Sequence, residues 1–186
     1  MAHFFPRKLA LLLLLLASLS IASSSVTKSC RPSGYLWRKA GGGCFDSDPD
    51  CCRLGKKYPK YLCSPLVTNS TSATMTLGSF SNVEENPTSC DTRSHSDSEI
   101  IIALSTGWYN GGSRCLKNIN IHGNGKSVLA KVVDECDSMN GCDADHEYEK
   151  PCANNVVDAS SAVWEALGFS KSQMAAGAHS ITWSDV

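Results

Sequence analysis

The chain has 186 residues, with 17 basic and 18 acidic side chains and a formal net charge of −1 at pH 7. This balance excludes the strongly basic composition of a nucleic-acid-binding domain, and the chain has no basic run that would hold an anionic membrane surface. The length suits a single domain with a sizeable core.

The first 25 residues have the pattern of a secretory signal peptide. Arg7 and Lys8 precede an almost unbroken apolar run over residues 9–17, and small residues follow over 18–25. This run is shorter than the about 20 residues that cross a bilayer, which disfavours the alternative of an uncleaved anchor. We therefore expect cleavage near Ser25 and a secreted, extracellular mature chain. Because the removed segment holds two bases and no acid, that chain has 15 basic and 18 acidic residues.

All ten cysteines lie in the mature part of the chain, and an even number of cysteines in an exported chain is typical of disulfide bonds. A zinc site is the alternative, but the sequence has no Cys-x-x-Cys pair and no closely spaced histidines, so we expect no metal and no other cofactor. Adjacent cysteines are expected to bond to different partners, because a ring between neighbours is strained. The predicted disulfide cysteines are Cys30, Cys44, Cys51, Cys52, Cys63, Cys90, Cys115, Cys136, Cys142 and Cys152.

Residues 26–66 form a cysteine-rich N-terminal segment. It holds half of the cysteines together with several glycines and prolines, which favour turns over regular periodicity. Such a segment buries little apolar surface by itself, so we interpret it as a small disulfide-pinned unit that packs on the rest of the chain. Directly after it, Asn69-Ser70-Thr71 matches the acceptor sequence for N-glycosylation of Asn69.

The remaining residues, 67–186, have the pattern of a mainly β domain, with an Asn-Gly pair at 124–125 that predicts a hairpin turn. Short strands are expected where apolar residues alternate with polar ones or form brief runs, namely over 73–77, 100–104, 119–121, 128–133 and 180–183. Many short strands with one inserted helix favour a closed β-barrel.

That helix is expected to begin at Asp158, whose carboxylate would cap it, and to end at Gly168. Val163, Ala166 and Leu167 share its apolar face.

Two aspartates follow apolar strand residues and are candidates for acid–base chemistry. Asp134 ends the run over 128–133, and Asp158 follows Val156-Val157. Two carboxyl groups aimed into one groove are what glycoside hydrolysis requires. The alternatives are a turn residue beside a disulfide for Asp134 and the helix cap for Asp158, and we favour the cap.

Two further stretches are candidates for binding. Trp108-Tyr109-Asn110 precedes a glycine pair, so the aromatic residues either lie exposed on a loop, ready to contact a partner, or belong to the core. An acidic stretch follows Cys136 and includes Asp137, Asp143 and Asp145. It lacks the spacing of a calcium loop, which favours a solvated acidic loop.

Several longer motifs stand out along the mature chain: CRPSG at 30–34, ALSTGWYNGGSRC at 103–115, AKVVDECDS at 130–138, NNVVDAS at 154–160 and ITWS at 181–184. Together they resemble the kiwellin and ripening-related proteins of plants. The resemblance covers nearly the whole mature chain and matches the shorter members, which lack an extra N-terminal cysteine-rich module. It implies a six-stranded double-psi β-barrel with one or two short helices over 67–186, shared more distantly with barwin and the expansins.

The resemblance also implies a function. We expect a monomeric, non-enzymatic defence or ripening-related protein of the apoplast or cell wall that binds an extracellular protein, such as one secreted by a pathogen. The alternative is a binder of cell-wall carbohydrate or a weakly lytic protein, in which Asp134 and Asp158 would act as acid and base. The residues proposed for binding are Trp108, Tyr109, Asn110, Asp134, Asp137, Asp143 and Asp145.

Overall fold

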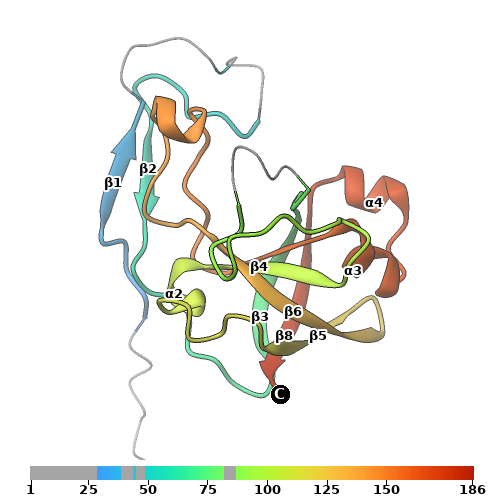
Figure 1. Cartoon of the computed structure of the whole chain (residues 1–186). Coiled ribbons are helices and arrows are strands. Elements are labelled where there is room, and N and C mark those ends of the chain that lie inside the picture. Colours follow the sequence, from blue (N-terminus) through green and yellow to red (C-terminus); the bar gives the residue numbers. More distant parts are fainter. Residues whose placement is uncertain (1–28, 39–43, 45–48, 82–86) are drawn as a thin grey trace, which may run out of the picture.

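The computed structural model describes residues 29–38, 44, 49–81 and 87–186, so the predicted signal peptide over 1–25 lies outside the described residues. A small two-stranded sheet lies beside a closed barrel (Figure 1). No helix in the described ranges combines the length and apolar character that a membrane span needs.

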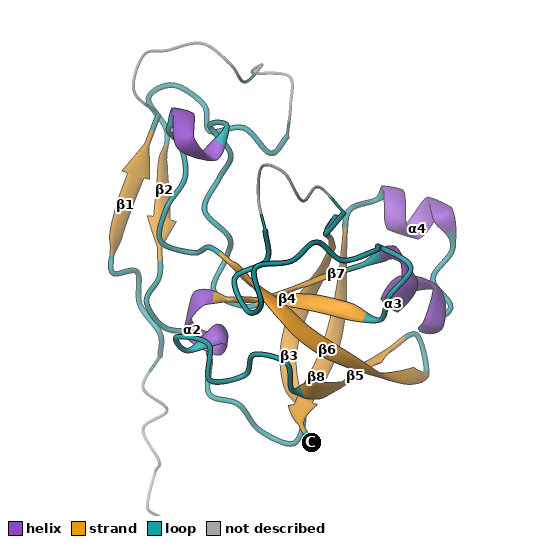
Figure 2. Ribbon diagram, viewed as in Figure 1, coloured by secondary structure: helices purple, strands orange, loops and turns teal. Residues whose placement is uncertain are grey.

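The barrel closes in the order β3-β7-β4-β6-β5-β8. Neighbouring strands run parallel in two cases, β3 with β7 and β4 with β6. The other four pairs of neighbouring strands run antiparallel (Figure 2). This mixed, closed six-stranded arrangement confirms the expected double-psi β-barrel. Its strands are β3 (Thr71–Leu77), β4 (Ile101–Ser105), β5 (Asn118–Gly123), β6 (Lys126–Cys136), β7 (Val156–Ala159) and β8 (Ala178–Asp185).

The inward side chains of these strands form the core, as the period-two alternation predicts. In β3, for example, Ala73 and Met75 are buried while their neighbours face outward. All of β4 is buried, because its outer face is covered by a second cluster that includes Phe80 and Val133. The Asn124-Gly125 turn joins β5 to β6 with positive φ at both residues, which confirms the predicted hairpin.

Three short α-helices accompany the barrel, one more than the one or two expected: α2 (Thr106–Tyr109), α3 (Ser161–Ala166) and α4 (Lys171–Ala175). The expected start of the helix at Asp158 is wrong. Asp158 belongs to β7, which continues to Ala159 between β3 and β4, so α3 begins only after Ser160. Gly168 ends this region with φ +77°, as expected.

The buried face of α3 also differs in one position from the expectation. Val163 and Leu167 are buried, but Ala166 is exposed. Trp164 is buried in its place and donates its indole N–H to the carbonyl of Thr76 at 3.1 Å. This hydrogen bond satisfies the polar atom of a large core residue and ties the helix to β3.

The two-stranded sheet pairs β1 (Gly34–Trp37) with β2 (Lys57–Lys60) in antiparallel register. Its small core consists of Cys52, Tyr58 and Cys142, with Leu36 packed against them. We call the β1–β2 unit the hairpin; it is distinct from the β5–β6 turn at Asn124-Gly125.

All ten cysteines are paired, as expected, and the adjacent Cys51 and Cys52 bond to different partners. Only one of the bonds, Cys52–Cys142, crosses from the N-terminal segment to the barrel chain. The pairs are Cys30–Cys63, Cys44–Cys51, Cys52–Cys142, Cys90–Cys115 and Cys136–Cys152.

We predict that Trp183→Ala lowers the free energy of unfolding by about 3–5 kcal/mol, because it leaves a cavity in the barrel core. Trp183 is 0% exposed and packs edge-to-face on Trp108, with ring centroids 5.1 Å apart. The control is Leu129→Ala on β6, where the side chain is 55% exposed and the expected change is within about 0.5 kcal/mol. Urea unfolding measures both. Equal losses would contradict the proposed core.

Candidate functional site

The barrel brings the two predicted aspartates together on its outer face. Asp158 in β7 and Asp134 in β6 are both register partners of Ala103 in β4, one from each side. Thr76 in β3 is the next residue in the same row, because it pairs with Asp158. The neighbour of Asp158 in β7, Val157, lies in the barrel core, so the row faces outward.

Asp158 has a desolvated carboxyl group. It accepts a hydrogen bond from the hydroxyl of Thr76, and the backbone of Gly78 approaches so closely that a Cβ there would collide with the carboxylate. Burial raises the pKa of Asp158; the hydrogen bond from Thr76 opposes this shift, and the charge of Asp134 adds to it. The structure therefore stabilises the neutral form of this carboxyl more than water does.

The side chain of Asp134 holds two backbone segments together. Its Oδ1 accepts hydrogen bonds from the backbone N–H groups of Ser89 and Glu135, each at 2.8 Å. Glu135 in turn accepts a hydrogen bond from the hydroxyl of Thr106 at 2.6 Å. Sequence reasoning missed Thr76 and Glu135, because only the register between strands places them beside the aspartates.

The prediction that Trp108 is an exposed contact residue is wrong. Trp108 is in the core, where its indole N–H donates to the carbonyl of Pro65 at 2.8 Å. Tyr109 is also buried, and this burial, together with the charges of Glu135 and Asp134, raises its pKa. The physical reason is that β4 continues directly into α2, which turns both aromatic rings towards the barrel. Asn110, at the exposed end of α2, remains accessible.

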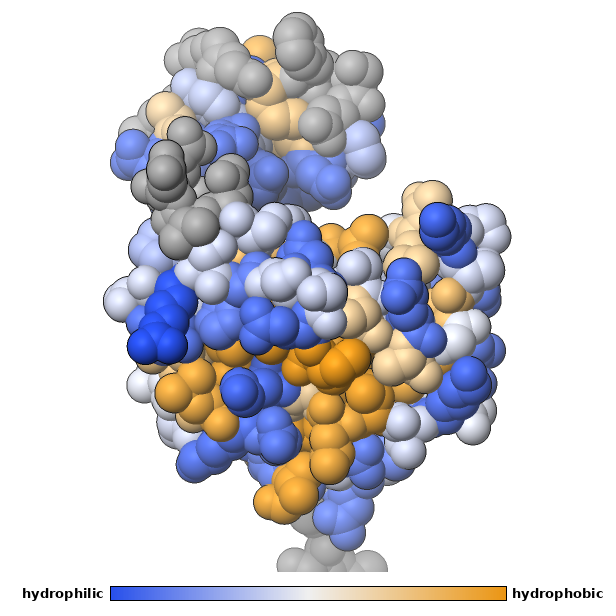
Figure 3. All heavy atoms as spheres, turned by 45° about the vertical axis from the view of Figure 1, so that its right-hand side comes forward, coloured by the Kyte–Doolittle hydropathy of each residue, from blue (hydrophilic) through white to orange (hydrophobic). Residues whose placement is uncertain are grey.

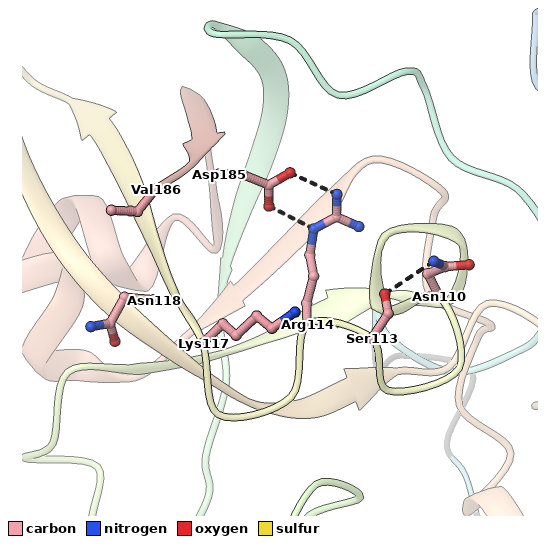
Figure 4. Close-up of a pocket in the computed structure, with 7 residues that line it drawn as sticks. All are labelled: Asn110, Ser113, Arg114, Lys117, Asn118, Asp185 and Val186. Carbon is pink, nitrogen blue, oxygen red and sulfur yellow. Dashed lines mark hydrogen bonds and ion pairs between the residues drawn. The ribbon is translucent and has the colours of Figure 1, made fainter.

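Asn110 lies on the rim of an open pocket of about 560 Å³ near the end of β8 (Figure 4). Arg114 fills much of its wall and forms two hydrogen bonds to Asp185, at 2.8 and 2.9 Å. The same guanidinium lies over the ring of Trp183 and donates to the carbonyl of Trp108. The hydrogen-bonded pair with Asp185 raises the pKa of Arg114 and lowers that of Asp185. Arg114 is therefore a structural clamp between β8 and α2.

A second pocket, of about 370 Å³, lies between the hairpin and the acidic stretch that follows Cys136. We call it the hairpin pocket. Its distinctive feature is a pair of aromatic side chains, Tyr35 and Trp37, which share one face of β1 and are each 54% exposed. Sequence reasoning missed them, although the alternation over 34–37 was a signal. The lining residues are Tyr35, Leu36, Trp37, Gly141, Cys142, Asp143, Ala144 and Tyr148.

The walls of the hairpin pocket are held together covalently and by backbone hydrogen bonds. The Cys52–Cys142 disulfide joins them. Cys52 N–H donates to the carbonyl of Tyr148 at 2.8 Å, and the guanidinium of Arg38 lies 4.9 Å from the centre of the Tyr148 ring. These connections hold the loop that carries Cys142 and Tyr148 against the N-terminal segment.

Of the three acidic binding candidates that follow Cys136, only Asp143 lines the hairpin pocket. Its Oδ1 accepts hydrogen bonds from the ring Nδ1 of His146 at 2.5 Å and from the His146 backbone. The hydrogen bond to the His146 ring is the main reason that the pKa of Asp143 is lowered. Asp137 accepts hydrogen bonds from the backbone of Met139 and Asn140 in its own turn, and Asp145 is exposed outside the pocket.

Among the residues that the structure describes, the other exposed large hydrophobic side chains are aliphatic. Apolar surface gathers over one face of the barrel (Figure 3), and the exposed residues of this kind include Leu77, Leu116 and Leu129. Interface hot spots are enriched in tryptophan and tyrosine and depleted in leucine, which favours the hairpin pocket as the contact site. The described residues contain no group of three side chains that could hold a metal ion.

Fold and surface together define a disulfide-bonded double-psi β-barrel protein with an aromatic pocket at its hairpin. The family model described as Kiwellin-1 matches residues 12–186, and the chain belongs to the kiwellin family. Kiwellin of Actinidia chinensis var. chinensis is 55% identical over 146 residues, which cover 77% of this chain and 67% of that protein. A ripening-related protein of Oryza sativa subsp. japonica is 51% identical over 158 residues, or 84% of this chain and 79% of that protein.

Among solved structures, an apo expansin of Clavibacter michiganensis matches 63% of this chain and 50% of its own, with 20% identity and a TM-score of 0.47. The barrel described above rests on this chain's own strand order and register.

We predict that Asp158→Asn changes the pH dependence of stability. The pKa of Asp158 is higher in the folded chain than the value of about 3.9 in the unfolded chain. Folded protein therefore binds this proton more tightly, and the free energy of unfolding falls as pH rises from about 3.9 through the raised pKa. Asparagine has no such loss, so the variant should gain stability relative to wild type between pH 4 and pH 7.

Urea unfolding at several pH values measures this difference, and Asp145→Asn controls for the loss of one negative charge. A variant that instead loses stability relative to wild type as pH rises would show that the fold favours the ionised carboxylate.

We also predict that the double variant Cys52→Ser, Cys142→Ser releases the hairpin from the barrel. A native disulfide contributes about 2–4 kcal/mol, and the hairpin has only a small core of its own. Limited proteolysis should cut the hairpin, while near-ultraviolet circular dichroism of the buried tryptophans stays native. The control is Cys90→Ser, Cys115→Ser, which leaves the hairpin linkage intact. Equal protease resistance of wild type and the first variant would contradict this role.

Proposed function

We propose that this protein is a secreted, non-enzymatic binding protein that recognises another extracellular protein through the hairpin pocket. The observation that carries the proposal is the pair Tyr35 and Trp37, exposed on a strand of the hairpin, which the Cys52–Cys142 disulfide ties to the barrel chain. Exposed aromatic residues with fixed positions lose little conformational freedom on binding, and such residues supply most of the energy at protein interfaces.

A role in plant defence fits the same features. Five disulfides persist in an oxidising compartment and resist unfolding and proteolysis, which supports action in the apoplast or cell wall. Relatives carry the names kiwellin and ripening-related protein. We propose a protein secreted by a pathogen as the partner. Asn69 is exposed in the turn before β3, where an N-linked glycan would extend into solvent away from the core.

The state of the two aspartates supports binding over catalysis. Asp134 uses Oδ1 to hold the backbone N–H groups of Ser89 and Glu135, and the carboxyl of Asp158 is enclosed by Thr76 and Gly78. A general acid or base needs to reach the proton that it transfers. Carboxyl groups engaged in this way are suited to holding the barrel surface together.

One observation favours a second candidate function, the binding or weak cleavage of cell-wall carbohydrate. Burial favours the neutral acid at Asp158, beside the carboxyl of Asp134, and a protonated acid next to a carboxylate is the pair that glycoside hydrolysis uses. Release of reducing sugar from wall polymers by the wild type, abolished by Asp134→Ala, would favour this function. We expect no release from either protein.

We predict that Trp37→Ala weakens partner binding. The mature protein is immobilised and exposed to secretions of plant pathogens, and a retained protein is then purified and its Kd measured. Truncation of a hot-spot tryptophan costs more than about 2 kcal/mol, so the Kd should rise by more than about thirtyfold. Leu66→Ala removes an exposed aliphatic side chain outside the hairpin pocket and should leave the Kd within about twofold. A partner that binds wild type and Trp37→Ala equally would contradict the proposal.

A further inference from the structure

We infer that the hairpin pocket receives a basic side chain, arginine or lysine, of the partner protein. The inference rests on the proposed function, since the ligand is part of a protein that the hairpin binds. A volume of about 370 Å³ is near the lower end for ligand pockets and suits one or two side chains.

The lining has the composition of a cation site. Three aromatic residues, Tyr35, Trp37 and Tyr148, are combined with Asp143, the one charged side chain of the eight lining residues. Aromatic faces attract ammonium and guanidinium groups, most strongly tryptophan and tyrosine. The guanidinium of Arg38 already lies over the Tyr148 ring, so Tyr35 and Trp37 are the rings left to contact a cation of the ligand.

Asp143 keeps acceptor capacity for such a cation. Both hydrogen bonds from His146 end on Oδ1, and the backbone of Asp145 also hydrogen-bonds to this carboxyl. A carboxylate has about four lone-pair sites, so it can still accept a hydrogen bond from a ligand. The lowered pKa keeps this carboxyl ionised. A carboxylate beside an aromatic surface binds a guanidinium by a charge-assisted hydrogen bond as well as by stacking.

The surrounding charge is complementary to a basic ligand. Between Lys131 and Lys150 the chain has seven acidic residues and no lysine or arginine. Asp143 and Asp145 are exposed members of this stretch. Lys57 is the register partner of Trp37, but it does not line the pocket. The acidic stretch therefore attracts a basic segment, and the aromatic pocket selects the side chain that enters.

Trp37 provides a direct readout of occupancy. The chain has four tryptophans, and the other three are at most 1% exposed. Acrylamide therefore quenches Trp37 selectively, and a ligand over its ring protects it. The probe is the peptide acetyl-Gly-Arg-Gly-amide, and its control is the same peptide with citrulline, the uncharged analogue of arginine.

We expect the arginine peptide to protect Trp37 of the full mature protein with a Kd in the millimolar range, as suits a single side chain. The citrulline peptide should bind about tenfold more weakly, because it lacks the charge. Asp143→Asn should weaken the arginine peptide by a similar factor. Asp145→Asn, which removes an equal charge from the same loop outside the pocket, should change its Kd by less than about twofold.

Three results would overturn the inference: equal binding of arginine and citrulline, equal losses in the two variants, or no protection at about 10 mM peptide. These results leave the proposed function standing if a captured partner still depends on Trp37. Conversely, a partner that binds wild type and Trp37→Ala with the same Kd would overturn the proposed function, whatever the peptide affinities are.

Discussion

The Cys52–Cys142 disulfide is the connection on which the hairpin pocket depends. The hairpin core consists of only a few side chains, and so small a core supplies little stability without a covalent link. The disulfide ties it to the loop that carries Asp143 and Tyr148. Two segments about 90 residues apart in sequence thus become two walls of one pocket.

The barrel acts as a rigid support for this pocket. Its core is filled by large side chains that include Trp108, Trp164 and Trp183, and closure of the sheet leaves no free edge within the barrel. Arg114 adds a clamp between β8 and α2. Because the scaffold is rigid, the hairpin can present aromatic side chains without the ordering cost of a flexible loop.

The contrast between the two candidate surfaces explains the functional conclusion. At the aspartate row, Asp134 holds two backbone N–H groups, and the carboxyl of Asp158 lies against Thr76 and Gly78 with a raised pKa. At the hairpin pocket, Tyr35, Trp37 and Asp143 are exposed. The exposed rings of the pocket are available to a ligand, whereas the contacts of the two aspartates connect neighbouring parts of the barrel surface.

By itself the sequence determined the mainly β class, five of the six barrel strands, the hairpin turn at Asn124-Gly125 and the disulfide state of the cysteines. Each of these depends on local periodicity, turn chemistry or composition. Tertiary structure alone decided the pairing of the cysteines and the assignment of Asp158 to a strand. It also decided the burial of Trp108 and the exposure of Trp37, because these depend on which distant segments meet and in what register. The sequence pattern of a short aromatic stretch does not distinguish a residue that distant segments bury, such as Trp108, from one that they leave exposed, such as Trp37.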